Sequence, residues 1–252
     1  MCSVSWLLDN DGYQVFFNRD EQKTRALALP PKHIVLQDVA VLMPIDPVAK
    51  GSWISVNEYG LTLCLLNNYQ GQAPSGVLIS RGQLVKLLSK SQNLAALEYE
   101  FSTLNLARYA PFTLLVFDAE LNNQQGKVMA FEWDGMCCNT FPEWSPRFSS
   151  GMDLDKVKRA RNDAYQDCIE SGECFQNLLT LHASHHPDHL HKSFCMHRED
   201  AHTVSFTHVQ VTARSQSMSY VAGSPCENLT QEAVVSNRIP LLANATPDLL
   251  AC

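Results

Sequence analysis

The sequence predicts an α+β protein of stacked sheets and helices, in which the sheets are largely antiparallel. The first observation is length: 252 residues, 45% of them hydrophobic, are enough to bury a large core in a single domain spanning residues 1–252. The second is that strand-like and helix-like stretches occur in separate blocks along the chain. The third is that short turn sequences join neighbouring strands. Such blocks are typical of layered α+β domains.

The first block is a β-hairpin at residues 2–18. Its arms, "CSVSWLL" and "YQVFFN", are rich in β-branched and aromatic residues, and "DNDG" between them is a strong turn sequence. If residues 10–11, or the four residues around them, form the loop, antiparallel pairing places Cys2 opposite Arg19. A loop one residue later would place Cys2 opposite Glu21. Both registers bring the charged "NRDE" segment beside the N-terminus.

A second hairpin is predicted at residues 51–67, where "GSWISVN" and "LTLCLLN" are joined through "NEYG". Strand alternation places Trp53 and Ser55 on the same face of this hairpin. The second arm ends in two polar amides, Asn67 and Asn68, directly after an apolar run. The pattern then becomes helical over residues 80–109, with a break near residues 91–93 that predicts two helices.

The second half of the chain repeats the alternation of blocks. Residues 112–141 predict a meander of the strands "FTLLVFD", "KVMAFEWD" and "CCNTF". Residues 153–183 predict a helix that is interrupted at "SGE". Strands return in "KSFCMH", "TVSFTHVQVTA" and "SMSYVAG", and the later stretch "ENLTQEAVV" fits either a short helix or an edge strand.

Composition argues against several classes of function. The net charge of −7 comes from scattered carboxylates, and no Lys/Arg cluster accompanies exposed aromatic residues, so we expect no nucleic-acid partner. No stretch approaches the roughly 20 apolar residues that span a bilayer, and the N-terminus lacks the pattern of a signal peptide. We therefore expect a cytoplasmic protein without a membrane span, in which the nine dispersed cysteines are mostly free thiols.

Cys2 would carry a nucleophile and a base on one residue if Met1 were removed. Methionine aminopeptidases act when the second residue is small, and cysteine qualifies. The mature chain would begin with an α-amine and a thiol, which titrate near roughly 7.7–8.0 and about 8.5. A terminal amine can activate such a nucleophile, and nearby Arg19 would favour the thiolate. Taken alone, Cys2 is more typical of a small buried residue in a first strand.

The "NRDE" segment raises a geometric question, because Arg19 and Asp20 are adjacent. In a regular strand their side chains would point to opposite faces, so we expect at least one of them to lie past the strand end or on a bulge. Charged residues after a strand usually form a solvated turn. The expected pairing with the N-terminus favours a functional interpretation instead.

Together these motifs resemble the NRDE family, which includes the transport and Golgi organisation 2 proteins. The resemblance lies in "MCSVSW" with "FFNRDEQKTR", in "GSWISVNEYGLTLCLLNNY" and in "CMHREDAHTVSFTHV", in that order over most of the chain. The family is similar to N-terminal nucleophile (Ntn) hydrolases of the cysteine type, including choloylglycine hydrolases, penicillin V acylases and acid ceramidases. The resemblance implies a four-layer αββα sandwich in which Cys2, at the end of a central strand, attacks a non-peptide amide.

The resemblance also implies the roles of four catalytic residues. Cys2 matches the nucleophile. Arg19 and Asp20 lie where the hydrolases place a guanidinium and a carboxylate that hold the nucleophile and its amine. Asn67 matches the position whose side chain helps to form the oxyanion hole, where a single donor contributes strongly to catalysis.

Further candidates for contacting a substrate come from the same motifs; they are Asn18, Trp53, Asn68, His197 and Arg198. Arg198 is also a candidate for the late arginine of the hydrolase site. The sequence departs from the hydrolases in two places. They carry R-x-x-D where this chain has R-D, and "RFSSGM" offers Ser149 and Ser150 where they carry a second asparagine.

Histidines concentrate in "LHASHHPDHLHKSFCMHREDAH", where His182, His185, His186 and His189 have helical spacing. Pro187 interrupts this pattern, so only His182 and His186 would form a helical pair. We interpret the segment as a polar helix end and loop, because histidine density without a partner cysteine or carboxylate is weak evidence for a metal. There is no C-x-x-C, Walker loop or dinucleotide fingerprint, so we expect neither a metal nor a cofactor.

Two hypotheses of function follow. The first is a hydrolase that uses Cys2 to cleave the amide C–N bond of a small acylated molecule. The second is a non-enzymatic binding or trafficking protein that keeps the fold and holds a hydrophobic ligand. Haem is a candidate ligand because members of the NRDE family have been linked with haem handling, and His197 would then be a candidate axial ligand.

Overall fold

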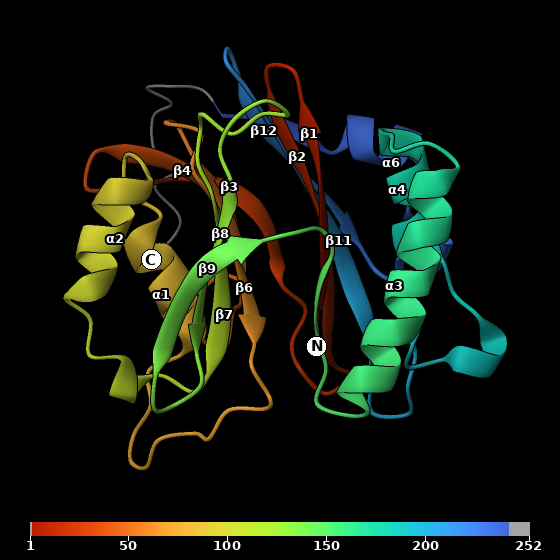
Figure 1. Ribbon diagram of the computed structural model, residues 1–252, viewed down its shortest axis with the longest axis horizontal. Coiled ribbons are helices and arrows are strands. Elements are labelled where there is room, and N and C mark those ends of the chain that lie inside the picture. The colour runs from red at the N-terminus through yellow and green to blue at the C-terminus, as the bar shows by residue number, and fades with distance from the viewer. Residues whose placement is uncertain (1, 242–252) are drawn as a thin grey trace.

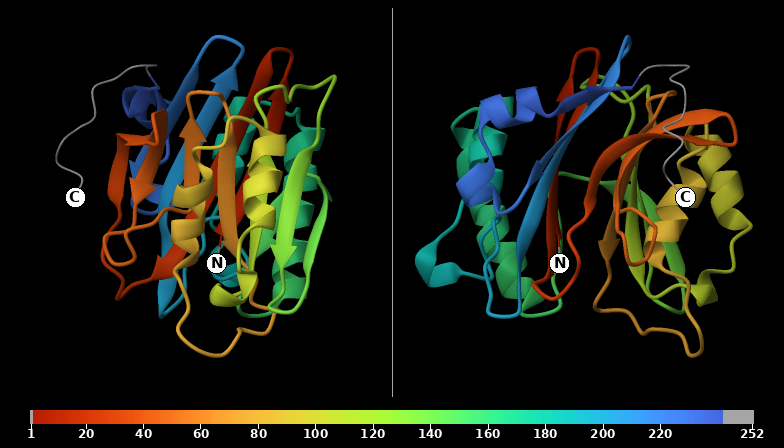
Figure 2. Two further views of the ribbon diagram at one scale, coloured as in Figure 1. Left: turned by 90° about the vertical axis from the view of Figure 1, so that its left-hand side faces the viewer. Right: turned by 180° about the vertical axis from the view of Figure 1, so that it is seen from behind.

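The computed structural model describes residues 2–241 and consists of four layers: helices, a sheet, a second sheet and helices (Figure 1). The view from behind in Figure 2 shows the two sheets stacked face to face with helices on both outer surfaces. Across the described residues, each pairing between strands is antiparallel. The predicted α+β class with largely antiparallel sheets is therefore confirmed.

The first sheet has the strand order β10-β1-β2-β11-β12-β13. Its strands are β1 (Cys2–Asp9), β2 (Gly12–Gln22), β10 (Arg147–Ser149), β11 (Ala201–Thr212), β12 (Gln216–Ala222) and β13 (Arg238–Pro240). The second sheet has the strand order β3-β4-β5-β6-β7-β8-β9. Its strands are β3 (Leu29–Leu36), β4 (Val39–Ile45), β5 (Ile54–Asn57), β6 (Thr62–Asn67), β7 (Phe112–Phe117), β8 (Val128–Trp133) and β9 (Cys138–Glu143).

The helices cover the outer faces of the two sheets. The second sheet is covered by α1 (Arg81–Leu88) and α2 (Leu94–Ser102), and the first by α3 (Leu154–Glu170), α4 (Phe175–Ala183), α5 (Pro225–Asn228) and α6 (Gln231–Ser236). Short 3₁₀ helices lie at Leu106–Arg108 and Pro187–His189. Within the described residues, none of the helices combines the length and apolar character needed to cross a membrane.

Three apolar clusters fill the spaces between the layers. The largest lies between the sheets, where the rings of Trp6 and Phe117 meet edge to face with centroids 5.4 Å apart. Leu84 and Phe101 pack α1 and α2 on the second sheet, and Tyr165 packs α3 on the first. Because both faces of the first sheet are covered, β1 and β2 are buried on both sides along most of their length.

The first hairpin has the register that places Cys2 opposite Arg19, as one of the two alternatives predicted. Asp9 pairs with Gly12, so the loop is the two residues 10–11. Gly12 is required there by close packing, because an added Cβ would lie 2.0 Å from the Val211 carbonyl oxygen of the neighbouring strand. The register fixes which side chains share the face of Cys2.

Most other predicted elements are confirmed, including the second hairpin, the two helices after residue 80, the meander and the divided helix after residue 153. Asn93 begins α2 by accepting a hydrogen bond from the Ala96 backbone N–H at 2.9 Å, which explains the break that separates α1 from α2. The stretch "ENLTQEAVV" is helical, since Pro225 starts α5 and the Thr230 side chain caps α6.

One strand predicted in the histidine-rich region is wrong. Residues 192–197, "KSFCMH", form a loop that contributes only an isolated bridge between His197 and His202. Phe194 and Cys195 are buried by this loop, so their apolar pattern reflects loop packing instead of a strand. The interpretation of the segment as a helix end and loop is confirmed, because α4 ends at Ala183 and His182 and His186 therefore form no helical pair. The side chain of His189 lies outside the described parts.

Candidate active site

Cys2 begins β1 and lies between two neighbouring strands of the first sheet. It pairs with Arg19 on β2 and with Ser149 on β10, so these three side chains share the face that points toward the second sheet. A cavity of about 340 Å³ reaches Cys2 from this side. Its lining comes from both sheets and includes Trp53 and Asn67. Four sequence-predicted candidates, together with Asp20, therefore line one cavity.

The side chain of Cys2 is a protonated thiol in its buried environment. Burial raises the pKa of the Cys2 thiol above its ordinary value, and the negative charge of Asp20 adds to this effect. A hydrogen bond from the Asp20 backbone and the positive charge of Arg19 act in the opposite direction without cancelling it. At neutral pH the thiol keeps its proton, so a nucleophilic role requires a base close to the sulfur.

Arg19 is held rigidly beside Cys2. Its guanidinium lies 4.2 Å from the centroid of the Trp53 ring, within the range of a cation–π contact. Its Nη2 atom lies 3.0 Å from the Glu21 carboxylate and 3.5 Å from the Asp46 carboxylate. Trp53 thus supports Arg19 from the opposite sheet. This places the arginine's positive charge at a fixed position next to the thiol.

Asp20 lies on the other face of β2, toward α3. Both Arg19 and Asp20 are inside β2, so neither lies past the strand end. The irregularity falls on the partner strand β11, where the register shifts between Thr203 and Ser205. The two charges are therefore divided between the faces of one sheet.

A residue that sequence reasoning missed, Arg161, faces Asp20. Arg161 is fully buried on α3, and its Nη2 atom lies 3.8 Å from Asp20 Oδ2, while Nη1 donates a hydrogen bond to Ser3 Oγ at 2.5 Å. Thr203 Oγ1 donates to Asp20 Oδ1 at 2.6 Å. The signal in the sequence was the position of Arg161, which lies on the buried stripe of α3 between Val157 and Tyr165 at four-residue spacing.

One oxygen of Asp20 has no hydrogen-bond donor among residues 2–241. Within the described residues, Oδ2 is buried and has the ionic contact with Arg161 but no hydrogen-bond donor. Buried carboxylate oxygens are normally satisfied, so an unsatisfied one marks a site where a donor is expected. Met1, whose removal would free the α-amine of Cys2, lies outside the described residues.

Asn67 and Asn68 end β6 and diverge. Asn67 lines the main cavity, and its Nδ2 donates a hydrogen bond to the Tyr69 hydroxyl at 2.9 Å, which leaves the second N–H of the amide for another acceptor. Asn68 lies on a neighbouring cavity of about 310 Å³ and donates to the Trp133 carbonyl at 3.4 Å. Only Asn67 lies on the cavity that contains Cys2.

Ser149 provides the second polar group next to Cys2. It is the direct partner of Cys2 on β10, and its hydroxyl is buried without a hydrogen-bond partner in the described residues. Ser150, in contrast, turns away and donates a hydrogen bond to the Met152 carbonyl. Of the two serines in "RFSSGM", Ser149 is the one whose oxygen lies on the nucleophile's side of the sheet.

Arg81 is a second cavity residue that sequence reasoning missed. It is the first residue of α1, where a positive charge is unfavourable for the helix dipole, and this was the available signal. Gly51 and Gly82 bring the helix start against the second sheet, because an added Cβ at Gly51 would lie 2.3 Å from the Gly82 carbonyl carbon. Arg81 donates to the Pro111 carbonyl at 2.9 Å, and no carboxylate of residues 2–241 forms an ion pair with it.

The other substrate-contact candidates lie in three different places. Asn18 is fully buried and donates to the carbonyls of His182 and Phe194, so it supports the fold and does not line the cavity. Arg198 lines an adjoining cavity of about 290 Å³ that also includes Asp20 and Asn67, and it forms an ion pair with Asp200. His197 lies outside the lining of both cavities and contacts two cysteines.

Comparison with known proteins gives one family and one fold. A family model described as Transport and Golgi organisation 2 matches residues 1–220. The chain is similar to the solved penicillin V acylase from Agrobacterium tumefaciens, with a TM-score of 0.54 and 10% identity over 88% of this chain and 83% of that chain. None of the curated proteins matches the sequence significantly.

The chain is also similar to a solved variant of the conjugated bile acid hydrolase from Clostridium perfringens, in which the cysteine at position 2 is replaced by alanine. The TM-score is 0.51, with 12% identity over 88% of this chain and 89% of that chain. A second variant of the same hydrolase, with an arginine replaced by leucine, gives a TM-score of 0.53 with 11% identity over the same shares. These likenesses confirm the expected αββα sandwich of Ntn-hydrolase type.

Proposed function

Because the chain belongs to the Transport and Golgi organisation 2 family and has the Ntn-hydrolase fold, we propose that it hydrolyses the amide C–N bond of a small acylated molecule. Cys2 is the nucleophile in this proposal and acts after Met1 has been removed. One observation carries the proposal: Cys2 lies on a cavity with Arg19 and Asn67, and its buried thiol needs a base that a free α-amine on the same residue would supply.

The first half of the reaction acylates the enzyme. Sγ of Cys2 forms a bond to the amide carbonyl carbon, and the thiol proton passes to the α-amine of Cys2. The carbonyl oxygen becomes an oxyanion, which accepts hydrogen bonds from the free N–H of Asn67 Nδ2 and from the Ser149 hydroxyl. When the C–N bond breaks, the α-ammonium returns the proton to the departing amine, and an acyl-cysteine remains.

The second half releases the acid. The α-amine of Cys2 takes a proton from water, the resulting hydroxide attacks the thioester carbonyl, and the C–S bond breaks. The products are a carboxylic acid and the free thiol, so the enzyme returns to its starting state. Asp20 holds the α-ammonium in both halves through Oδ2, the oxygen that lacks a hydrogen-bond donor in the described residues. Arg161 fixes that carboxylate from the helix side.

Charge in the cavity points to an anionic substrate. Arg19 and Arg25 are already paired with the carboxylates of Glu21 and Asp46. Arg81 lines the same cavity and has no carboxylate partner in the described residues, so it is available to bind a carboxylate, sulfonate or phosphate on the substrate. A volume of about 340 Å³ suits a small molecule. The substrate class is therefore an N-acyl amide that carries an anionic group.

The test is turnover by the native-start protein against a panel of N-acyl amides that includes penicillin V, a conjugated bile acid and N-acyl amino acids. The first two are named for the relatives in the fold and not for this chain. Cys2→Ala should abolish hydrolysis and leave the circular dichroism spectrum and melting temperature near those of the wild type. Full activity of this variant on a substrate that the wild type hydrolyses would rule out the mechanism.

The second hypothesis, a binding protein for a hydrophobic ligand such as haem, finds little support in the main cavity. Three arginines, two aspartates and a glutamate line it, and a hydrophobic ligand would have to desolvate them. A haem titration separates the two hypotheses. A Soret shift that survives Cys2→Ala and disappears in His197→Ala would favour the binding protein, whereas an acyl adduct on Cys2 favours the enzyme.

A further inference from the structure

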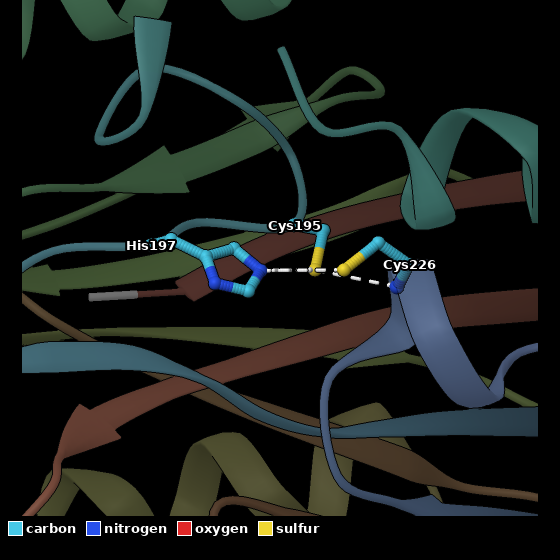
Figure 3. A group of neighbouring side chains, drawn as sticks. All are labelled: Cys195, His197 and Cys226. Atoms are coloured by element: carbon cyan, nitrogen blue, oxygen red, sulfur yellow. Dashed lines mark hydrogen bonds between the residues drawn. The ribbon is translucent and has the colours of Figure 1, made fainter. Parts of the chain in front are cut away.

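Two cysteines and a histidine from distant parts of the chain converge away from the active-site cavity. Cys195 and His197 lie on the loop between α4 and β11, and Cys226 lies on α5. Figure 3 shows the imidazole of His197 directed at the two sulfur atoms. One potential ligand atom from each residue lies within 4.8 Å of the others. Because 31 residues separate the two cysteines, no short spacing motif marks the group in the sequence.

We propose that Cys195, His197 and Cys226 bind a zinc ion through two sulfur atoms and the Nε2 nitrogen, with the fourth position open to water. The site is independent of Cys2 and of the proposed hydrolase activity. The fold adds Cys226 to Cys195 and His197, which both lie in the histidine-rich segment. Borderline-soft Zn²⁺ suits a mixed set of thiolate and imidazole ligands.

The two distances from the imidazole nitrogen to the sulfur atoms match those of a tetrahedral site. With Zn–S bonds of about 2.3 Å and Zn–N bonds of about 2.0–2.1 Å, sulfur and nitrogen ligands at tetrahedral angles lie roughly 3.5 Å apart. The Nε2 atom of His197 lies 3.5 Å from Cys195 Sγ and 3.3 Å from Cys226 Sγ. The imidazole nitrogen therefore already lies at ligand distance from both sulfur atoms.

Backbone and ring contacts surround the three ligand residues. The backbone N–H of Cys226 donates a hydrogen bond to Cys195 Sγ at 3.4 Å. His185 packs on the His197 ring with centroids 4.3 Å apart and contacts the Cys195 carbonyl.

The three ligand residues differ in their exposure to solvent. Cys195 is buried, His197 is half-buried and Cys226 is exposed, so an ion can enter from the side of α5. The metal would tie α5 to the loop that also carries Met196 and Arg198, both of which line the cavity adjoining the active site. Zinc would thus fix one wall of that cavity and stabilise the folded state by mass action.

The experiment uses untagged, reduced protein and Zn²⁺ as the probe. Zinc per chain is measured by elemental analysis, affinity by competition with a chromophoric chelator, and ligand type by the thiolate-to-metal absorption of the Co²⁺ form. We expect one zinc per chain, a melting temperature that rises with zinc, and thiolate bands with Co²⁺. Cys226→Ala should fold, since Cys226 is exposed. It should weaken zinc binding by well over roughly tenfold, the loss expected when a residue that only hydrogen-bonds to a metal ligand is removed.

Matched controls separate this site from other thiols and imidazoles. His197→Ala should behave like Cys226→Ala, whereas Cys174→Ala and His186→Ala, which remove exposed groups outside the cluster, should bind zinc like the wild type. Cys2→Ala should also leave binding unchanged. Equal zinc affinity in Cys226→Ala and the wild type would overturn the proposal. So would a Cys195–Cys226 disulfide that persists under reducing conditions, detected as the loss of two hydrogens in the intact mass.

Discussion

Arg161 on α3 and Asp20 on β2 form a buried ion pair across the layer between helix and sheet, with 3.8 Å between Nη2 and Oδ2. Both side chains are almost completely inaccessible to solvent. The pair anchors the carboxylate that we place next to the α-amine of Cys2. Ser3 accepts a hydrogen bond from Arg161, and Thr203 donates one to Asp20, so both charges have a further partner inside this layer.

Removing Arg161 should therefore cost far more stability than removing a surface arginine of the same helix. Arg161→Met removes the arginine that is paired with the buried Asp20 carboxylate, and we expect a loss of about 3–5 kcal/mol in the free energy of unfolding. Arg159→Met, on the exposed face of α3, should change it by less than about 0.5 kcal/mol. Urea denaturation measures both variants. Equal midpoints would show that the ion pair does not contribute.

The buried histidines predict how stability depends on pH. Burial lowers the pKa of His182 from 6.5 to about 3 and that of His208 likewise from 6.5 to about 3. Each binds a proton in the unfolded chain below pH 6.5 but remains neutral in the folded protein, so stability is complete above pH 6.5 and falls as the pH drops toward 3. Each histidine should contribute a slope of about 1.4 kcal/mol per pH unit within that window.

Substitution of one histidine checks this slope. His208 Nε2 lies 3.0 Å from Gln14 Oε1, and a glutamine at position 208 keeps a donor there without titrating. His208→Gln should remove one proton from the pH dependence of unfolding, whatever its effect on stability at pH 7. An unchanged slope in His208→Gln would mean that His208 is protonated in the folded protein.

Substituting the two adjacent asparagines in turn distinguishes an oxyanion donor from a structural residue. Asn67→Ala should lower kcat by about 10²–10³-fold on any substrate that the wild type hydrolyses, because an oxyanion donor acts mainly in the transition state. Asn68→Ala removes an amide of the same strand end that lies on another cavity, and it should retain kcat within a few-fold. Steady-state kinetics with both variants decide the assignment. A similar loss in both would place the oxyanion elsewhere.

Arg81 should determine preference for anionic substrates. Arg81→Gln should raise KM for an N-acyl amino acid and leave KM for its neutral amide analogue nearly unchanged, because only the former offers a charge to the guanidinium. Lys86→Gln is the control, since Lys86 lies on the same helix but outside the cavity lining. If Arg81→Gln raised KM equally for both substrates, recognition of charge would be excluded.

The local pattern predicted those elements whose turns and caps are local in sequence. The "DNDG" turn set the register that pairs Cys2 with Arg19, and the break before Asn93 separated two helices. The strands β3 and β4 were not predicted. In β3, Pro30, Pro31 and the polar Lys32 obscure the strand pattern at the edge of the sheet. "KSFCMH" was misread because a buried loop and a short strand share one apolar pattern.

Some residues of the candidate active site could be predicted from the sequence and others could not. Cys2, Arg19 and Asn67 could be placed together from hairpin pairing and motif resemblance. Arg161 and Arg81 could not, because their positions depend on how helices pack on the two sheets. The Cys195 and Cys226 pair likewise depends on tertiary packing of a loop against α5. These contacts depend on long-range packing. The two-residue period of strands and the 3.6-residue period of helices do not predict such packing.

The most direct test of the central claim is the intact mass of the native-start protein, alone and after incubation with a β-lactam or activated-amide acyl donor. The account predicts loss of the Met1 mass, then a single acyl adduct that peptide mapping assigns to Cys2 and that is absent from Cys2→Ala. Retention of Met1 in fully folded protein would contradict it, because the α-amine of Cys2 would then be blocked and its buried thiol would have no base.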